Sequence, residues 1–280
     1  MKEIKVNDIK EALKDALIKS CCSISNNVLE ALKKASLEEE SPLGKDVINK
    51  IIENDEEAIK SNKPLCQDTG IVVCFVELGY DVHLDGDLYQ AINDAVSLAY
   101  TDGFLRKSVV KDPIDRINTK DNTPAIIHLN LVPGENLKIT VLPKGAGSEN
   151  MSAIKMLTPA DGIEGIKNFV LNTVKLAGGK PCPPIMVGVG IGGNFEKCAM
   201  LAKEALTREI DDVNPLPLYQ QLESELEEEN TDSGLNYIND INNHCGYVKV
   251  KDRFGDYGIV GFFAVKHGKC LNLLFSCRTI

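Results

Sequence analysis

Apolar residues in the first sixty positions recur at intervals of three and four residues, the spacing of one face of a helix. Polar stretches interrupt this pattern at 23–27 and at 41–42. The pattern therefore predicts a helical N-terminal region, about 1–62, with breaks at these two points. The positions that carry the pattern are Ile9, Leu13, Ala16, Leu17, Val28, Leu29, Leu32, Val47, Ile51 and Ile52.

Short apolar runs replace this spacing after residue 70, as is typical of strands. The run IVVCFVEL at 71–78 predicts a buried strand, and we expect the following segment, 80–84, to pair with it. Two later runs are joined across a Pro-Gly turn. The elements predicted here are strands at 71–78, 80–84, 124–132 and 137–142, and a helix from Asp87 to about Gly103.

The second half of the chain mixes helical and strand patterns without a regular β-α-β alternation, so we do not predict a doubly wound sheet. We expect one α/β (α+β) domain over 1–280, with mixed sheets packed against helices. The elements predicted are a glycine-rich turn at 143–153, helices at about 162–176 and 195–206, a strand in PCPPIMVGVGIGG, an acidic helix face within 213–245, and strands around short turns in 247–276.

Composition narrows the class of protein. Apolar residues make up 43% and charged residues 26% of the 280 positions, as in ordinary globular proteins. No run of eighteen apolar residues predicts a membrane span, and the charged N-terminus lacks a secretory apolar core. We therefore expect a cytoplasmic protein. A net charge of −10, with no Trp, argues against a nucleic-acid partner.

Nine cysteines are an unusual number for a cytoplasmic chain, in which disulfides are not expected. There is no C-x-x-C pair, so zinc-ribbon and thioredoxin-like sites lack their usual signature. Cys74 and Cys198 lie in apolar patterns and are predicted to be core residues. Cys66, Cys182 and Cys277 lie instead in loop-like segments marked by charge or proline.

Two glycine-rich motifs suggest close backbone approaches. GVGIGG at 188–193 does not match the dinucleotide fingerprint G-x-G-x-x-G, and a tight turn from strand to helix explains it better, although its amides could also face an anion. PKGAGSEN at 143–150 offers Lys144, Ser148 and Asn150 as donors around two glycines. This second motif is either a ligand-binding loop or an ordinary polar hairpin loop.

The segment 104–128 carries Arg106 and Arg116 ahead of a strand, with two asparagines nearby. Arginine suits bidentate recognition of a carboxylate, although either residue taken singly could be a surface arginine. The spacing of the three loop cysteines does not by itself establish a metal site. Three thiolates on a four-iron cluster would, however, leave one iron open as a Lewis acid for a hydroxyl or a carboxylate.

In combination, these motifs resemble the N-terminal domain of class I fumarases, or the alpha subunit of two-subunit fumarate hydratases and L(+)-tartrate dehydratases. The resemblance covers about residues 8–277 and is weak near 225–256. The motifs that carry it are CQDTG, R-x-S from Arg106, DPIDRINTKDNTPAIIH, KGAGSENMSAIKML, CPPIMVGVGIGG and a cysteine near the C-terminus.

The resemblance implies that Cys66, Cys182 and Cys277 hold a [4Fe-4S] cluster with one iron lacking a protein ligand. The family usually has a histidine about twelve residues before the third cysteine. This chain has Val265 there, and His267 is the nearest histidine.

Substrate contacts are implied by the resemblance for Gln67, Asp68 and Arg106, and for a glycine of the KGAGSEN turn, of which we select Gly147. Asp68 would tune or orient a hydroxyl base supplied by another domain. A separate beta subunit would carry that domain, giving a hetero-oligomer that acts on a small hydroxy dicarboxylate.

The resemblance leads us to expect a hydro-lyase, with fumarate hydratase first and L(+)-tartrate dehydratase second. A non-catalytic cluster-binding regulatory or assembly protein is the alternative of another class. Such a protein would need the thiolates but neither Asp68 nor Arg106, so their presence favours an enzyme. A zinc-dependent or thiol-dependent enzyme is a third possibility that lacks the expected flanking histidines.

Overall fold

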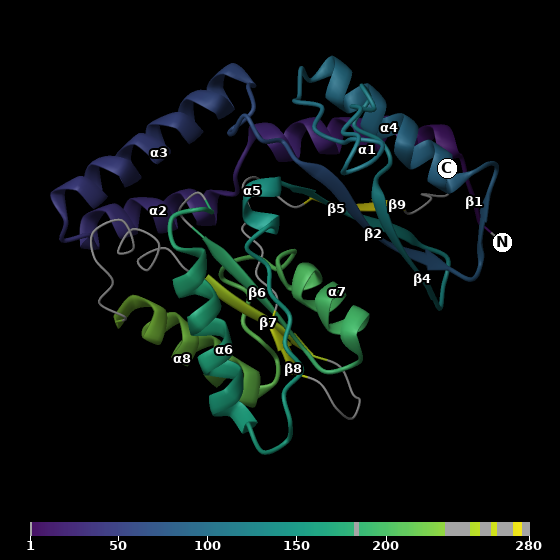
Figure 1. Cartoon of the computed structure of the whole chain (residues 1–280). Coiled ribbons are helices and arrows are strands. Elements are labelled where there is room, and N and C mark those ends of the chain that lie inside the picture. The colour runs from purple at the N-terminus through teal and green to yellow at the C-terminus, as the bar shows by residue number, and fades with distance from the viewer. Residues whose placement is uncertain (1, 182–184, 233–246, 253–258, 262–270, 276–280) are drawn as a thin grey trace. The chain divides into compact units, whose positions relative to one another are not determined.

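The computed structural model describes residues 2–181, 185–232, 247–252, 259–261 and 271–275, which form two compact units (Figure 1). The first unit comprises the described residues within 1–24, 55–146 and 267–280, and the second those within 25–54 and 147–266. Helices and mixed sheets build both units, which confirms the predicted α/β class. Whether the two units act as one catalytic domain over 1–280 stays a prediction.

Three helices occupy the N-terminal region, with breaks where the sequence predicts them, but the first residues are not helical as predicted, because Lys2–Ile4 form a strand. The helices are α1 (Val6–Cys22), α2 (Asn26–Glu38) and α3 (Pro42–Ser61). Helix α1 buries Ile9, Leu13 and Leu17 completely, because these positions share one helix face. In the described part of the chain, no helix combines the length and apolarity needed to cross a membrane.

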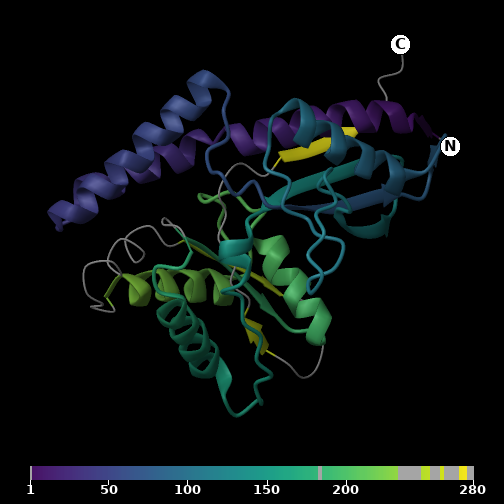
Figure 2. The ribbon, with the colours of Figure 1, turned by 45° about the horizontal axis from the view of Figure 1, so that its top comes forward.

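The first unit is built on a four-stranded sheet in the order β4-β2-β5-β9, with β2 and β4 parallel and the other pairs antiparallel. Helices α1 and α4 lie side by side over one face of this sheet (Figures 1 and 2). Val72, Cys74 and Val76 alternate along β2 and enter the core beneath these helices. The elements introduced here are β2 (Ile71–Gly79), β4 (Ile126–Val132), β5 (Leu137–Lys144), β9 (Leu271–Phe275) and α4 (Leu88–Asp102).

The predicted pairing of the segment 80–84 with the strand before it is wrong. Strand β3 (Val82–Leu84) instead pairs in parallel with β1 (Lys2–Ile4) in a separate two-stranded sheet. The reason is that both edges of β2 are already occupied, by β4 on one side and β5 on the other. The same arrangement separates β4 from β5, which are consecutive in the chain but lie on opposite sides of β2.

The second unit contains a three-stranded sheet in the order β7-β6-β8, with α7 on one face and α6 and α8 on the other (Figures 1 and 2). Along β6, Val187 and Val189 join the core with α6 and α8. The elements are β6 (Met186–Ile191), β7 (Tyr247–Asp252), β8 (Ile259–Gly261), α6 (Gly162–Ala177), α7 (Phe195–Ala205) and α8 (Pro217–Asp232).

The GVGIGG motif serves helix packing in this unit. A Cβ atom added at Gly188 would lie 2.2 Å from the carbonyl oxygen of Ala202, and one at Gly190 would lie 2.0 Å from that of Cys198. Both glycines therefore let the backbone of α7 lie directly against β6. Gly192 and Gly193 follow with φ of +88° and +74°, which makes the predicted tight turn from strand to helix.

Candidate active site

The segment 62–70 connects α3 to β2 and carries the predicted cluster ligand Cys66, which is half-buried. The backbone N–H of Asp68 donates to Cys66 Sγ over 3.4 Å. The side chain of Gln67 is exposed, and its Oε1 accepts from the Cys66 thiol over 3.5 Å. An N–H donor aimed at a sulfur suits a metal-binding thiolate, because such bonds stabilise the negative charge on sulfur.

Asp68 is fixed by the end of a strand far from it in sequence. Its Oδ2 accepts from the backbone N–H of Ala146 over 2.9 Å. The antiparallel pairing of β2 with β5 places Ile71 opposite Lys144, so the segment before β2 meets the segment after β5. Among the described residues, the other carboxylate oxygen of Asp68 has no hydrogen-bond partner and is available for chemistry.

Two glycines make this meeting of segments possible. Gly70 has φ of +72°, and a Cβ atom there would lie 2.2 Å from the carbonyl oxygen of Lys144. A Cβ atom on Gly145 would lie 3.1 Å from Asp68 Oδ2. A side chain at position 70 would push the two segments apart, and one at position 145 would crowd the carboxylate of Asp68.

Arg106 lies on a loop that is anchored to the same segment. The hydroxyl of Thr69 donates to the backbone carbonyl of Arg106 over 3.0 Å, and the neighbouring Leu105 is buried. The guanidinium of Arg106 is exposed, and it has no hydrogen-bond or ion-pair partner within the described residues. The backbone is therefore held while the charged group stays free to bind an anionic ligand.

Two polar residues that the sequence did not identify as part of the site hold its backbone. The hydroxyl of Tyr100 donates to the carbonyl oxygens of Thr69, over 2.7 Å, and Gly70, over 3.0 Å. Burial raises the pKa of Tyr100 well above its ordinary value, so this hydroxyl remains a donor. Asn122 is the second such residue, and its amide also reaches Gly70.

The buried cysteines differ in character from Cys66. Burial raises the pKa of both Cys21 and Cys74 to about 12, so these thiols keep their protons and do not suit metal ligation. Cys74 and Cys198 are buried, which confirms that they are core residues. Of the five cysteines that the structure describes, Cys66 alone is not buried, and it fits the ligand role chemically.

The remaining predicted cluster ligands, Cys182 and Cys277, lie outside the described residues, as does His267. Within the described ranges, no group of three or more histidine, cysteine, aspartate or glutamate side chains is placed to hold a metal ion. The three-thiolate site therefore stays a prediction, with one of its members placed.

The KGAGSEN motif forms a single helical turn, α5 (Ala146–Glu149), where the sequence predicts a loop. Gly147, the predicted substrate-binding glycine, is exposed, and a Cβ atom there would meet nothing within 4 Å. Glu149 forms an ion pair with Lys203 of α7, so the end of the motif has a structural partner within the second unit.

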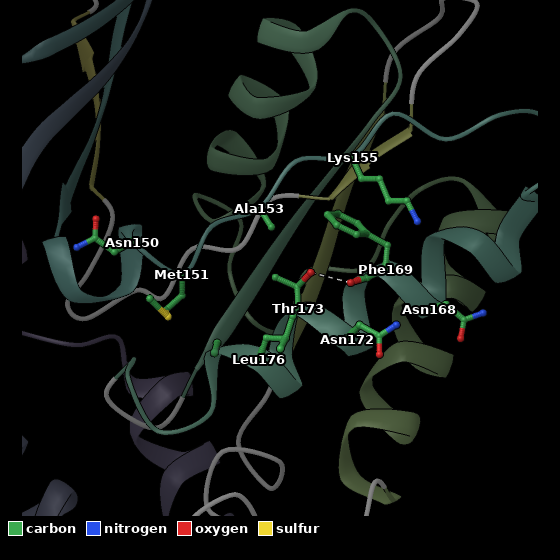
Figure 3. A pocket seen from close by; sticks show the side chains of 10 residues that line it. Asn150, Met151, Ala153, Lys155, Asn168, Phe169, Asn172, Thr173 and Leu176 are labelled. Carbon is green, nitrogen blue, oxygen red and sulfur yellow. Dashed lines mark hydrogen bonds between the residues drawn. The ribbon is translucent and has the colours of Figure 1, made fainter.

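A hollow in the second unit lies between the chain after α5 and the outer face of α6 (Figure 3). It encloses about 420 Å³ and combines apolar groups such as Phe169 and Leu176 with the side chains of Lys155 and Asn172. Its lining includes none of the predicted catalytic residues that the structure describes. We assign no chemistry to this hollow.

Comparison with known proteins identifies the family. The family described as Fumarate hydratase (Fumerase) matches residues 10–236. A Methanocaldococcus jannaschii protein named "Putative L(+)-tartrate dehydratase subunit alpha" is 40% identical over 240 residues, covering 83% of this chain and 82% of that protein. The L(+)-tartrate dehydratase subunit alpha of Escherichia coli strain UTI89 is 32% identical over 241 residues, covering 85% and 78%. The chain therefore belongs to the fumarate hydratase (Fumerase) family of hydro-lyases, as its motifs predict.

Proposed function

We propose that this chain is the alpha subunit of an iron-sulfur hydro-lyase that removes water from a small hydroxy dicarboxylate, with L(+)-tartrate as the leading substrate. The sequence motifs alone favoured fumarate hydratase over tartrate dehydratase. The names of the relatives support the opposite order, because proteins 31–40% identical to this chain are named as tartrate dehydratase alpha subunits. Fumarate hydratase is the second candidate and is supported by the family description.

The observation that carries the proposal is the constellation at the start of β2. The segment 66–69 carries a half-buried thiol that accepts from the backbone N–H of Asp68, and a carboxylate held by the backbone N–H of Ala146. The same segment binds the backbone carbonyl of Arg106, whose guanidinium is free within the described residues, through the hydroxyl of Thr69. A protein that only bound a cluster would need Cys66 but would have no use for Asp68 or Arg106. The combination supports catalysis over storage or regulation.

The chain's own groups match the demands of the reaction. Loss of water requires removal of a proton from the carbon beside a carboxylate, and negative charge then builds on that carboxylate. The free guanidinium of Arg106 is suited to bind a carboxylate through two parallel hydrogen bonds. Asp68, with one oxygen held by Ala146, presents the other to orient or tune a hydroxyl base.

In this proposal the cofactor is a [4Fe-4S] cluster held by Cys66, Cys182 and Cys277. When bound, the cluster supplies a Lewis acid for the departing hydroxyl group. Gln67 follows Cys66 directly and presents an exposed amide, which can donate to a substrate oxygen. Gly147 would allow close approach of the backbone to the substrate.

A beta subunit completes the proposed enzyme, as the word alpha in the names of the relatives suggests. It would supply the base hydroxyl and further cationic groups for the far end of the substrate. We place the complex in the cytoplasm, where cysteines remain reduced.

The test is to co-express this chain with its beta subunit, reconstitute the complex with iron and sulfide without oxygen, and measure dehydration of L(+)-tartrate and of L-malate in parallel. We expect turnover of L(+)-tartrate to exceed that of L-malate. The variant Asp68→Asn tests whether this carboxylate is needed for turnover. Asp94→Asn is its matched control, because Asp94 is exposed on α4 and bonds only Gln90 within the described residues. Faster turnover of L-malate would reverse the order of the two substrates.

A further inference from the structure

Asn122 is the most completely buried polar residue near the candidate site, with no exposed surface. It lies in the loop before β4, and its backbone has φ of +64°, in the left-handed region. Asparagine and glycine enter this region at the lowest cost among the common residues. Its side chain uses both ends of the amide, so Asn122 is fixed by its backbone and by its side chain at once.

The two ends of this amide bind two different segments of the site. Asn122 Nδ2 donates to the carbonyl oxygen of Gly70 over 3.0 Å, at the end of the segment that carries Cys66 and Asp68. Asn122 Oδ1 accepts from the backbone N–H groups of Ser108, over 2.7 Å, and Val109, over 3.1 Å. A single side chain therefore bridges the start of β2 and the loop that follows Arg106.

The bridge acts beside a second link between the same segments. Thr69, the residue before Gly70, donates its hydroxyl to the backbone carbonyl of Arg106. Ser108, bound by Asn122, is two residues beyond Arg106. The chain is thus held at the carbonyl of Arg106 and again two residues later, and a loop held at two points keeps its register.

We infer that Asn122 is a positioning residue that sets the location of the Arg106 guanidinium relative to Asp68. This inference rests on the proposed function, in which Arg106 binds a substrate carboxylate. Asn122 itself touches no reacting group in this scheme. The amide of Asn122 donates to one carbonyl and accepts from two N–H groups, while glycine can supply the backbone conformation without the bridge.

The variant Asn122→Gly separates these two contributions, because it keeps the left-handed backbone and removes the amide. We expect KM for the hydroxy dicarboxylate to rise by roughly tenfold to a hundredfold, with a smaller change in kcat, since misplacing a binding group by about 1 Å has effects of this size. Asn122→Asp is the second variant: it can still accept from Ser108 and Val109 but, as a carboxylate, cannot donate to Gly70.

The control is Tyr100→Phe. Tyr100 donates to the same carbonyl of Gly70, so its loss weakens the same segment without touching the loop of Arg106. Both variants lose a buried hydrogen bond to the carbonyl oxygen of Gly70; Tyr100→Phe also loses the bond to Thr69, and Asn122→Gly also loses those from Ser108 and Val109. A merely structural role for Asn122 would make the two variants alike in KM as well as in thermal stability. A positioning role predicts that Asn122→Gly raises KM far more than Tyr100→Phe at a similar loss of melting temperature.

A double-mutant cycle with Arg106→Ala then tests whether Asn122 acts through Arg106. If it does, Asn122→Gly has little further effect on kcat/KM once the guanidinium is gone. Tyr100→Phe should instead have the same effect in both backgrounds. Additive effects of Asn122→Gly and Arg106→Ala would overturn the inference, because they would show that the two side chains contribute independently.

Amide hydrogen exchange of the alpha–beta complex gives a readout that does not depend on the reaction. In the wild type we expect slow exchange at Ser108 and Val109, and in Asn122→Gly we expect both to exchange at least tenfold faster. Tyr100→Phe should leave these two amides slow. Unprotected amides in the wild type would overturn the bridge itself, whatever the variants do.

The two readouts distinguish failure of this inference from failure of the proposed function. If no hydroxy dicarboxylate is dehydrated but the amides respond as expected, the bridge stands and the assigned function fails. If the enzyme is active and Asn122→Gly leaves KM unchanged while the amides open, the bridge exists but does not position Arg106, and the inference is refuted.

Discussion

Replacing Asp68 by Asn should separate the catalytic role of this side chain from its structural one. The carboxylate accepts one hydrogen bond, from the backbone N–H of Ala146, and an amide oxygen can accept the same bond. A hydrogen bond to a charged group contributes about 1.5–3 kcal/mol, and a neutral one about 0.5–1.5 kcal/mol. Asp68→Asn should therefore lower the free energy of unfolding by only about 1 kcal/mol.

The effect on turnover should be far larger. A side chain that takes part in proton transfer contributes roughly 10²–10⁴ in rate, which corresponds to about 3–5 kcal/mol in the activation barrier. The assay is dehydration by the reconstituted complex at saturating substrate, with urea unfolding and iron content measured on the same preparation. We expect iron content close to that of the wild type in Asp68→Asn and in the exposed control Asp94→Asn.

Loss of iron in Asp68→Asn would refute the reasoning, because Asp68 would then be needed for the cluster rather than for chemistry. A free energy of unfolding lowered by much more than about 1 kcal/mol would also refute the reasoning, because replacing one charged hydrogen bond by a neutral one cannot account for it. Turnover within a few fold of the wild type, with the cluster in place, would show that Asp68 takes no part in proton transfer.

Three further predictions concern the glycines and the buried thiol. Gly147→Ala should leave the melting temperature nearly unchanged, because an added Cβ meets nothing within 4 Å. The same variant should weaken substrate binding, and an unaltered KM would show that Gly147 does not contact the substrate. Gly190→Ala should destabilise the protein by about 1–3 kcal/mol in urea unfolding, because its Cβ would lie 2.0 Å from the carbonyl oxygen of Cys198. A urea midpoint equal to that of the wild type would contradict the packing of α7 on β6. Burial raises the pKa of the Cys74 thiol from an ordinary 9.0 to about 12, so the folded state holds this proton more tightly than the unfolded state. The free energy of unfolding should therefore fall by about 1.4 kcal/mol per pH unit as pH rises from 9 towards 12. Cys74→Val should lose less stability over this pH range in the same urea unfolding series, and equal slopes for variant and wild type would show that Cys74 is not the cause.

Local signals in the sequence were sufficient to predict the longer helices, although not the single turn α5. Asp87 ends the extended segment before α4 and accepts from the backbone N–H of Gln90, as an N-cap does. Gly178, with φ of +52°, follows the last residue of α6. These features depend on neighbours within one helical turn, so they can be read from the chain directly.

Strand partners could not be predicted in the same way, because pairing joins residues far apart in sequence. Val82 pairs with Lys2, and nothing near either residue indicates the other. The insertion of β2 between β4 and β5 likewise depends on the whole sheet. The sequence therefore predicted β2, β4 and β5 as strands, but it missed β1, which lies in the region predicted to be helical, and it did not predict every neighbour.

In the candidate site, too, some features follow from nearby residues and others from contacts between residues far apart in sequence. Cys66, Asp68 and Arg106 stand in short motifs that suggest their chemistry. The backbone beside them is held in part by Tyr100 and Asn122, which are 30 and 52 residues from Gly70. Asn122 looks like one more polar residue in a loop until its bonds are seen. Reactive residue types were thus predictable, while the groups that position them were not.

The central claim is that this chain, with its beta subunit and a cluster held partly by Cys66, removes water from L(+)-tartrate. The most direct measurement is oxaloacetate formation by the anaerobically reconstituted complex, alongside iron and acid-labile sulfide per alpha chain, for the wild type and Cys66→Ser. We predict about four of each per wild-type chain, tartrate-dependent oxaloacetate, and loss of both cluster and activity in the variant. A wild-type complex that holds its cluster yet forms no oxaloacetate from tartrate would contradict the claim.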